Sequence, residues 1–99
     1  MKIVIAGAGE VGSHLAKMLS NESNNITVLD SDQERLESLA SSTDVITVTG
    51  NPSSIEVLKE AGCENADLFI AVHPDTSQDV NIVSSLLAKR LGSKKVTAD

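Results

Sequence analysis

Residues 2–12 read KIVIAGAGEVG, a short apolar run followed directly by the pattern G-x-G-x-x-G. The apolar part predicts a buried strand, and the residues after the glycines have helical spacing. Gly7 would let the chain leave the strand in a tight turn, Gly9 would let a pyrophosphate approach the backbone, and Gly12 would let the helix pack close to the strand. Because N–H groups at a helix start lack partners within the helix and carry partial positive charge, this stretch predicts a diphosphate-binding site.

A second β-type run, residues 26–29, leads into Asp30. An acidic residue about 20 positions beyond the glycines accepts hydrogen bonds from ribose hydroxyls in dinucleotide-binding folds. A carboxylate there would repel a 2′-phosphate, which favours NAD over NADP, although Arg35 lies close in sequence and could offset that repulsion. Two alternatives stay open: Asp30 caps the next helix, or the nucleotide is ATP or ADP, which would satisfy the same carboxylate and the same glycine turn.

The rest of the chain continues the alternation of strands and helices. Runs typical of strands occupy about residues 2–6, 26–29, 45–48, 68–72 and 95–98, with a helical pattern in each interval. This order predicts an α/β fold, a Rossmann-like doubly wound parallel sheet with strand order 3-2-1-4-5 and helices on both faces. We expect one nucleotide-binding domain over residues 1–99 that continues beyond Asp99, because a six-stranded dinucleotide domain needs one more unit.

Two further patterns predict where the helices begin and which of their sides are buried. Ser31 with Glu34, and Ser53 with Glu56, have the spacing of capping boxes. Apolar residues at helical spacing predict the buried sides, namely Val11, Leu15, Met18 and Leu19 in the first helix and Ile82, Val83, Leu86 and Leu87 in the fourth.

In such a sheet a ligand lies beyond the carboxyl ends of the strands, where the strand order reverses, here between the first strand and the fourth. The glycine turn forms one wall and residues 72–75 form the other, while Asp30 and Asn51 extend the rim towards the adenosine. His73 is the one crevice residue that could transfer protons, but a loop histidine before Pro74 is the favoured interpretation. No set of residues has the spacing of a catalytic triad or a metal site, so the sequence predicts neither.

The composition argues against several classes of protein. The net charge is -6 and Phe69 is the only aromatic residue, which disfavours nucleic acid because phosphates would be repelled and bases would find no stacking platform. The single cysteine, Cys63, excludes an internal disulfide and fits a reducing compartment. No apolar run approaches the ~20 residues that span a bilayer, so we expect a cytoplasmic domain.

Several segments outside the glycine turn carry a resemblance to a known family. They are Val28–Asp32, Gly50-Asn51, Leu58–Gly62, Asn65–Val72 and Asp79–Asn81, in that order along the chain. Together with the glycine turn they resemble the TrkA N-terminal domain family, also called RCK or KTN domains, over essentially the whole chain. The Leu-x-x-Ala-Gly and Ala-Asp-Leu segments are the more specific part, because many dinucleotide-binding folds share the glycines and the acidic residue.

The resemblance implies a regulatory domain and not an enzyme. Such domains bind NAD or NADH, or ATP and ADP in some members, and form dimers or rings under a membrane potassium transporter, at the inner face of the membrane. The family usually has Thr where His73 stands and often Asp where Asn51 stands. By similarity, the diphosphate is held by Gly7, Ala8, Gly9, Glu10 and Val11, the ribose by Asp30, and the adenine and the second wall by Asn51 and the His73-Pro74 pair.

The alternative hypothesis is the cofactor-binding half of an NAD-dependent dehydrogenase, since the same fold serves both functions. That function needs a following substrate domain with a positioned acid or base. A third hypothesis, an interaction module that has lost its nucleotide, conflicts with the intact glycines and Asp30.

Overall fold

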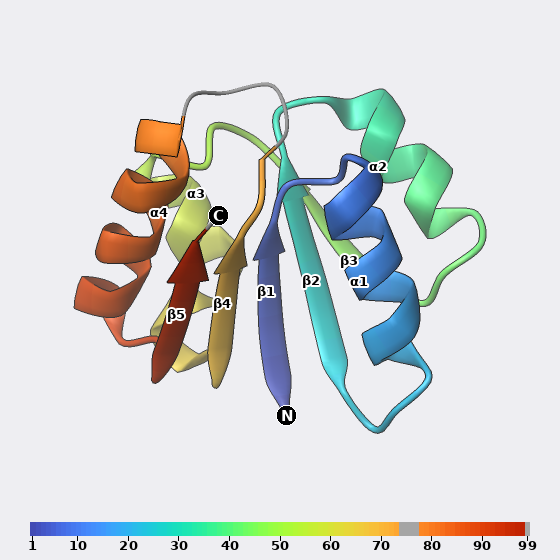
Figure 1. The fold of residues 1–99 in the computed structure, drawn as a ribbon, viewed down its shortest axis with the longest axis horizontal. Coiled ribbons are helices and arrows are strands. Elements are labelled where there is room, and N and C mark those ends of the chain that lie inside the picture. The colour runs from blue at the N-terminus through green and yellow to red at the C-terminus, as the bar shows by residue number, and fades with distance from the viewer. Residues whose placement is uncertain (74–77, 99) are drawn as a thin grey trace.

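The strands lie parallel in one sheet, in the predicted order β3-β2-β1-β4-β5. The structure is a computed structural model that describes residues 1–73 and 78–98. All carboxyl ends of the strands lie at one edge of the sheet, and the order reverses between β1 and β4 (Figure 1). The strands are β1 (Lys2–Ala6), β2 (Asn25–Asp30), β3 (Ile46–Thr49), β4 (Leu68–Ala71) and β5 (Lys95–Ala98).

Three strands differ from the prediction by one residue at one or both ends. The strand β2 includes Asn25 and Asp30, because the ladder to its neighbours continues to both positions. The strand β3 begins at Ile46 and not at Val45, and β4 ends at Ala71 and not at Val72. Asp30 is therefore the last residue of β2, paired with Thr49 of β3.

The central strand β1 is covered on both faces. Ile3 and Ile5 face one side of the sheet and Val4 and Ala6 the other, because successive side chains alternate along a strand. None of these four side chains is more than 1% exposed. A strand buried in this way needs a continuous apolar run, which explains why residues 2–6 contain one.

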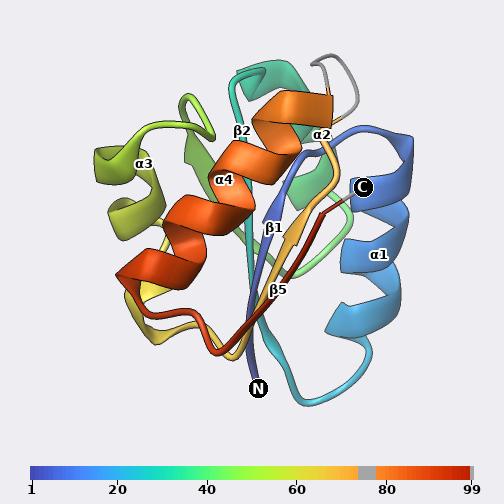
Figure 2. The same ribbon diagram turned by 60° about the vertical axis from the view of Figure 1, so that its left-hand side comes forward.

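Two helices pack on each face of the sheet (Figures 1 and 2). The helices α1 (Glu10–Ser20) and α2 (Gln33–Ala40) cover one face, and α3 (Ile55–Glu60) and α4 (Gln78–Leu91) cover the other. A short 3₁₀ turn, η1 (Cys63–Asn65), follows α3 and had no counterpart in the predicted elements.

The predicted buried side of α1 is partly wrong. Val11 and Met18 are 56% and 55% exposed, whereas Leu15 and Leu19 are half-buried. The residues of this helix that are fully buried are Gly12 and Ala16, one turn apart. Small side chains at this spacing let the helix approach the sheet closely, and the larger ones are displaced to its flanks.

The predicted buried side of α4 is wrong for three of its four residues. Ile82, Val83 and Leu86 are exposed, and Leu87 alone packs against the core in part. The side that faces the sheet has the same helical period but carries small or polar residues, namely Asn81, Ser84, Ser85 and Ala88. The hydroxyls of Ser84 and Ser85 donate to carbonyls within the helix, so the burial of these side chains leaves no polar group unpaired.

Both predicted capping boxes are wrong by one residue. The cap of α2 is Asp32 and not Ser31, because the Asp32 carboxylate accepts the N–H groups of Glu34 and Arg35 at 3.0 and 3.3 Å. An aspartate at this position competes well with a serine for the same N–H groups. The cap of α3 is Ser54 and not Ser53, with its Oγ accepting from Val57 N at 3.4 Å.

Candidate functional site

The glycine turn connects β1 to α1 and touches the exit of β4. Gly7 has φ +128°, a conformation that residues with a side chain rarely adopt. A Cβ built on Gly7 would lie 2.7 Å from the carbonyl of Val72 and 2.8 Å from the Cα of His73. The two predicted walls of the crevice are therefore in direct contact at this point, and only glycine allows it.

Gly12 and Gly9 differ in what the fold demands of them. A Cβ on Gly12 would overlap the carbonyl oxygen of Gly7, so glycine is needed for α1 to pack against the turn, as predicted. Gly9 is the N-cap of α1 with φ −76° and ψ −160°, a backbone conformation that is open to any residue. Gly9 has no side chain to cap this helix start, and the role predicted for it, close approach of a phosphate, stays a prediction.

Asp30 lies completely buried at the end of β2 and ties three segments together. Its Oδ2 accepts the N–H of Ala8 in the glycine turn at 2.7 Å, and its Oδ1 accepts the N–H of Asp32 at 2.8 Å. Its carbonyl oxygen accepts the N–H of Gly50 beyond β3 at 3.0 Å. Asp32 and not Asp30 caps α2, so the alternative role considered for Asp30 is wrong. The carboxylate instead fixes the glycine turn against the start of α2.

His73 lies next to Asp30, which sequence reasoning did not foresee. It is 6% exposed, and its Nε2 lies 3.5 Å from Oδ1 of Asp30. Within the part of the chain that the structure describes, neither ring nitrogen has a hydrogen-bond partner. The favoured interpretation, an ordinary loop histidine, does not describe a ring buried against the predicted ribose acceptor.

Asn81 is a site residue that the sequence interpretation missed as such. Its Oδ1 accepts the N–H of His73 at 2.9 Å, and its Nδ2 donates to the carbonyl of His73 at 3.4 Å. Asn81 is 5% exposed, and a buried amide in the first turns of a helix normally has a defined partner. Its place in the Asp79–Asn81 segment was the only signal for it. The side chain anchors the exit of β4 to the start of α4.

Three of the remaining predicted site residues, Asn51, Glu10 and Val11, are exposed. Asn51 is exposed beyond β3, and its Oδ1 accepts the N–H of Ser53 at 2.8 Å, which stabilises the turn into α3. Glu10 and Val11 are exposed at the start of α1. Pro74 lies outside the described residues.

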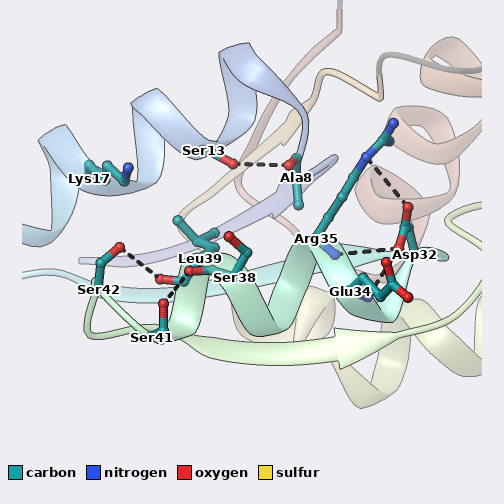
Figure 3. Close-up of a pocket in the computed structure, with 10 residues that line it drawn as sticks. All are labelled: Ala8, Ser13, Lys17, Asp32, Glu34, Arg35, Ser38, Leu39, Ser41 and Ser42. Atoms are coloured by element: carbon teal, nitrogen blue, oxygen red, sulfur yellow. Dashed lines mark hydrogen bonds and ion pairs between the residues drawn. The ribbon is translucent and has the colours of Figure 1, made fainter.

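A polar groove of about 500 Å³ runs between α1 and α2 (Figure 3). It reaches Ala8 and Asp32, the two residues whose N–H groups hold Asp30. Arg35 lines it, with its Nε 3.6 Å from Oδ2 of Asp32, so this guanidinium is engaged with the cap of its own helix. Lys17 of α1 lies on the opposite wall.

Two features of the described residues concern metal binding and cysteine chemistry. No group of three or more His, Cys, Asp or Glu side chains among them could hold a metal ion. Burial raises the pKa of the Cys63 thiol to about 12, against a smaller opposing effect of Lys2, so this thiol is not a nucleophile at neutral pH. Over the same residues, no helix has both the length and the apolar character to cross a membrane.

Solved structures similar to this chain share its fold. The AMP-bound form of the Kef CTD from Shewanella denitrificans aligns with a TM-score of 0.75 at 21% identity, over 97% of this chain and 57% of that one. The TrkA-N domain of the inner membrane protein ybaL from Escherichia coli aligns with a TM-score of 0.69 at 19% identity, over 98% and 86%. A short-chain dehydrogenase/reductase family oxidoreductase from Aeromonas hydrophila reaches 0.69 at 18% identity, over 90% and 51%. At such identities the likeness shows the fold alone.

Sequence comparisons are more specific. The chain is 44% identical over 96 residues to a Trk system potassium uptake protein TrkA homolog from Archaeoglobus fulgidus, which is 97% of this chain and 21% of that protein. It is 46% identical over 91 residues to the Trk system potassium uptake protein TrkA of Halomonas elongata, which is 92% of this chain and 20% of that protein. The chain thus spans about a fifth of the length of the curated relatives it matches. The family model of the TrkA-N domain matches residues 3–99, and the chain therefore belongs to the TrkA-N domain family.

Proposed function

We propose that this chain is a nucleotide-sensing regulatory domain of a potassium uptake transporter and that it binds NAD or NADH at the glycine turn. One observation carries the nucleotide proposal: the Asp30 carboxylate is bonded to the N–H of Ala8, directly before a helix start whose N-cap residue, Gly9, has no side chain to cap it. A ribose acceptor and a phosphate-binding helix start are thereby joined in one rigid unit. The names of the relatives, Trk system potassium uptake proteins, support the role in potassium transport.

In this proposal each predicted residue keeps its role. The backbone from Gly7 to Gly12, including Ala8, Gly9, Glu10 and Val11, holds the diphosphate, and Asp30 holds the ribose. Asn51 and the His73-Pro74 pair line the adenine side and the second wall. AMP, ADP and ATP share the phosphate and ribose chemistry of NAD, and the related fold solved with AMP fits a site for an adenine nucleotide.

The site also offers a physical route from ligand to regulation. Asp30 is completely buried, so a ribose can reach it only if a neighbouring side chain moves aside. The neighbour in contact is His73, whose backbone is bonded to Asn81 at the start of α4. A ligand that binds the shifted arrangement more tightly than the closed one changes the position of α4 and the packing of this domain on its partners.

The proposed partners are a membrane potassium-transporter subunit and further copies of the domain in a dimer or ring. The domain would act in the cytoplasm, at the inner face of the membrane, through that subunit. We propose a non-enzymatic role because the relatives are named as potassium uptake proteins. The dehydrogenase alternative has only the shared fold in its favour.

A ligand-dependent melting experiment tests the nucleotide proposal. The protein is melted with excess NAD, NADH, NADPH, AMP, ADP and ATP in parallel, and a ligand at 100 times its dissociation constant adds about 2.7 kcal/mol to stability. Gly9→Val should abolish this gain and leave a folded domain, since the backbone at Gly9 accepts a side chain. Met18→Ala, an exposed change on the same helix, is the matched control and should keep the gain.

A flat response to every nucleotide would contradict the proposal. A response that is strongest with NADPH would leave nucleotide binding intact but refute the selectivity assigned to Asp30.

A further inference from the structure

We infer that His73 makes nucleotide binding depend on protons: the protonated ring holds Asp30 and keeps the ribose out, so affinity falls as the pH is lowered. This inference rests on the proposed function, because it concerns the same carboxylate. It adds a dependence on protons to the binding role that His73 has in the proposed function.

The first step is the geometry of the carboxylate. Both oxygens of Asp30 already accept one backbone N–H each, from Ala8 and from Asp32. A carboxylate oxygen can accept a second hydrogen bond, and the side of Oδ1 that remains is occupied by the His73 ring at 3.5 Å. A ribose hydroxyl that bonds to Oδ1 takes that same acceptor position, so ring and ribose compete for it.

The second step is burial. The side chains of His73 and Asp30 are 3% and 0% exposed, so water does not screen them from each other. Neither ring nitrogen has a hydrogen-bond partner among residues 1–73 and 78–98. A buried imidazole without a partner, directed at a buried carboxylate, is unusual unless a ligand or a proton completes the arrangement.

The third step is charge. Histidine is the side chain that normally changes its charge between pH 5 and 8. Protonation places a donor and a positive charge beside a buried carboxylate, where ionic hydrogen bonds are at their strongest. The neutral ring interacts more weakly with the Asp30 carboxylate. Binding of a ribose to Asp30 must therefore expel the proton, and linkage then requires the dissociation constant to rise as protons become abundant.

Other charged groups border this place but do not replace Asp30. On α2, Asp32 and Arg35 pair with each other at 3.6 Å. Asp79 lies in the first turn of α4 and Glu10 in the first turn of α1, and both are exposed. Asp75 lies outside the described residues. Within the described part of the chain, Asp30 is the one acidic group at ion-pair distance from the His73 ring.

An affinity that rises as the pH is lowered would also have a physical cause. A protonated His73 that turned towards the phosphates would strengthen binding at low pH. The ring's position favours the first sign, because Nε2 already faces Asp30 and the start of α1 supplies the positive potential for phosphate.

Calorimetric titration with NAD at pH 5.5, 6.5, 7.5 and 8.5 tests the inference. NAD is the probe because its phosphates are diesters without a second ionisation, whereas a terminal phosphate titrates near pH 6. The dissociation constant of the unmodified chain should rise towards acid pH by up to about tenfold per unit, with one proton released per ligand. His73→Gln should bind NAD with an affinity that hardly changes over this range. His14→Gln removes the other histidine, which is exposed on α1, and should behave like the unmodified chain.

A second measurement covers the case that His73→Gln does not fold. The ring proton signals of His73 in the unmodified chain are followed by NMR against pH, and saturating NAD should move their transition to lower pH. Affinity that is independent of pH, affinity that rises towards acid pH, or an equal slope in His73→Gln would each overturn the inference and leave nucleotide binding standing. Absence of NAD binding at every pH would instead overturn the proposed function, and this inference with it.

Discussion

Replacement of Asp30 by asparagine should destabilise the fold by about 2 kcal/mol even without any nucleotide. Each carboxylate oxygen accepts one backbone N–H, at 2.7 Å from Ala8 and 2.8 Å from Asp32. A hydrogen bond to a charged acceptor contributes about 1.5–3 kcal/mol. Asparagine has the same shape, but its amide oxygen can accept only one of the two N–H groups while its NH₂ group faces the other.

The sum of the opposing effects sets the expected size. One lost bond costs about 1.5–3 kcal/mol, and a donor that remains buried without an acceptor adds to that loss. Asparagine also removes a charge that is completely buried, and this recovers part of the lost free energy, which leaves a net loss of about 2 kcal/mol. For a domain of this size such a loss lowers the melting temperature by about 8–16 °C.

Urea unfolding followed by circular dichroism measures this free energy. Asp44→Asn is the matched control, because Asp44 is an exposed aspartate just before β3 and its replacement should change little. If Asp30→Asn unfolds with a free energy within about 0.5 kcal/mol of the unmodified chain, the Asp30 bonds are not the structural tie described above.

Three further predictions concern the fold. Gly12→Val should cost at least about 1–3 kcal/mol in a urea titration, since its Cβ would overlap the Gly7 carbonyl, and unchanged unfolding would contradict the close packing of α1. The N–H of Lys2 and, with a smaller effect, the ammonium of Lys94 hold the pKa of the Asp67 carboxyl below 3.8. This carboxylate therefore stabilises the fold above pH 3.8, and its contribution is lost as the pH falls through its lower folded pKa. Asp67→Asn should make the free energy of unfolding less dependent on pH in this acid range, and an unchanged dependence would refute the bond. The Cys63 thiol should react with a disulfide reagent at pH 8 far more slowly in the native state than in urea, and fast labelling of the native state would show that the thiol is accessible. Because its pKa is about 12 in the fold against 9.0 unperturbed, the contribution of the buried neutral thiol to the free energy of unfolding is retained up to pH 9 and lost above it.

The sheet was predictable because its signals are local and redundant. Residues 2–6 and 68–72 carry continuous apolar runs, which only strands covered on both faces require, and parallel order follows from the alternation with helices. The edge strand β5 was predictable from its place in the alternation of strands and helices, although it is less buried.

The packing of the helices was not predictable from their large apolar residues. In α4 the exposed set Ile82, Val83 and Leu86 and the buried set have the same period, so periodicity cannot distinguish them. The distance between helix and sheet decides which set is buried, since a helix with small residues towards a sheet can approach it more closely than one with large residues there. The caps failed for a related reason: Ser31 and Asp32 are both good caps, and the position where the chain leaves β2 chooses between them.

The site was predictable in its parts but not in its contacts. The glycines and Asp30 occupy the positions that their spacing predicts. The pairing of His73 with Asp30 joins residues more than forty positions apart in two different strand exits, and no spacing rule reports on that. Asn81 escaped for a different reason: its partner is the backbone of His73, close by in sequence, and no residue pattern marks an amide side chain that bonds to a backbone.

The small buried side chains of α4 have a mechanical consequence. Its carboxyl-terminal half is fastened by Leu87 and Leu91 in the core and by the bond from Ser93 Oγ to the carbonyl of Cys63 at 2.7 Å. The described residues of its amino-terminal half add no large apolar side chain to the core, and those buried there include Asn81 and Ser84. The helix is thus anchored in the core mainly through its carboxyl-terminal half, whereas its amino-terminal end is held to the exit of β4 by the bonds between Asn81 and His73.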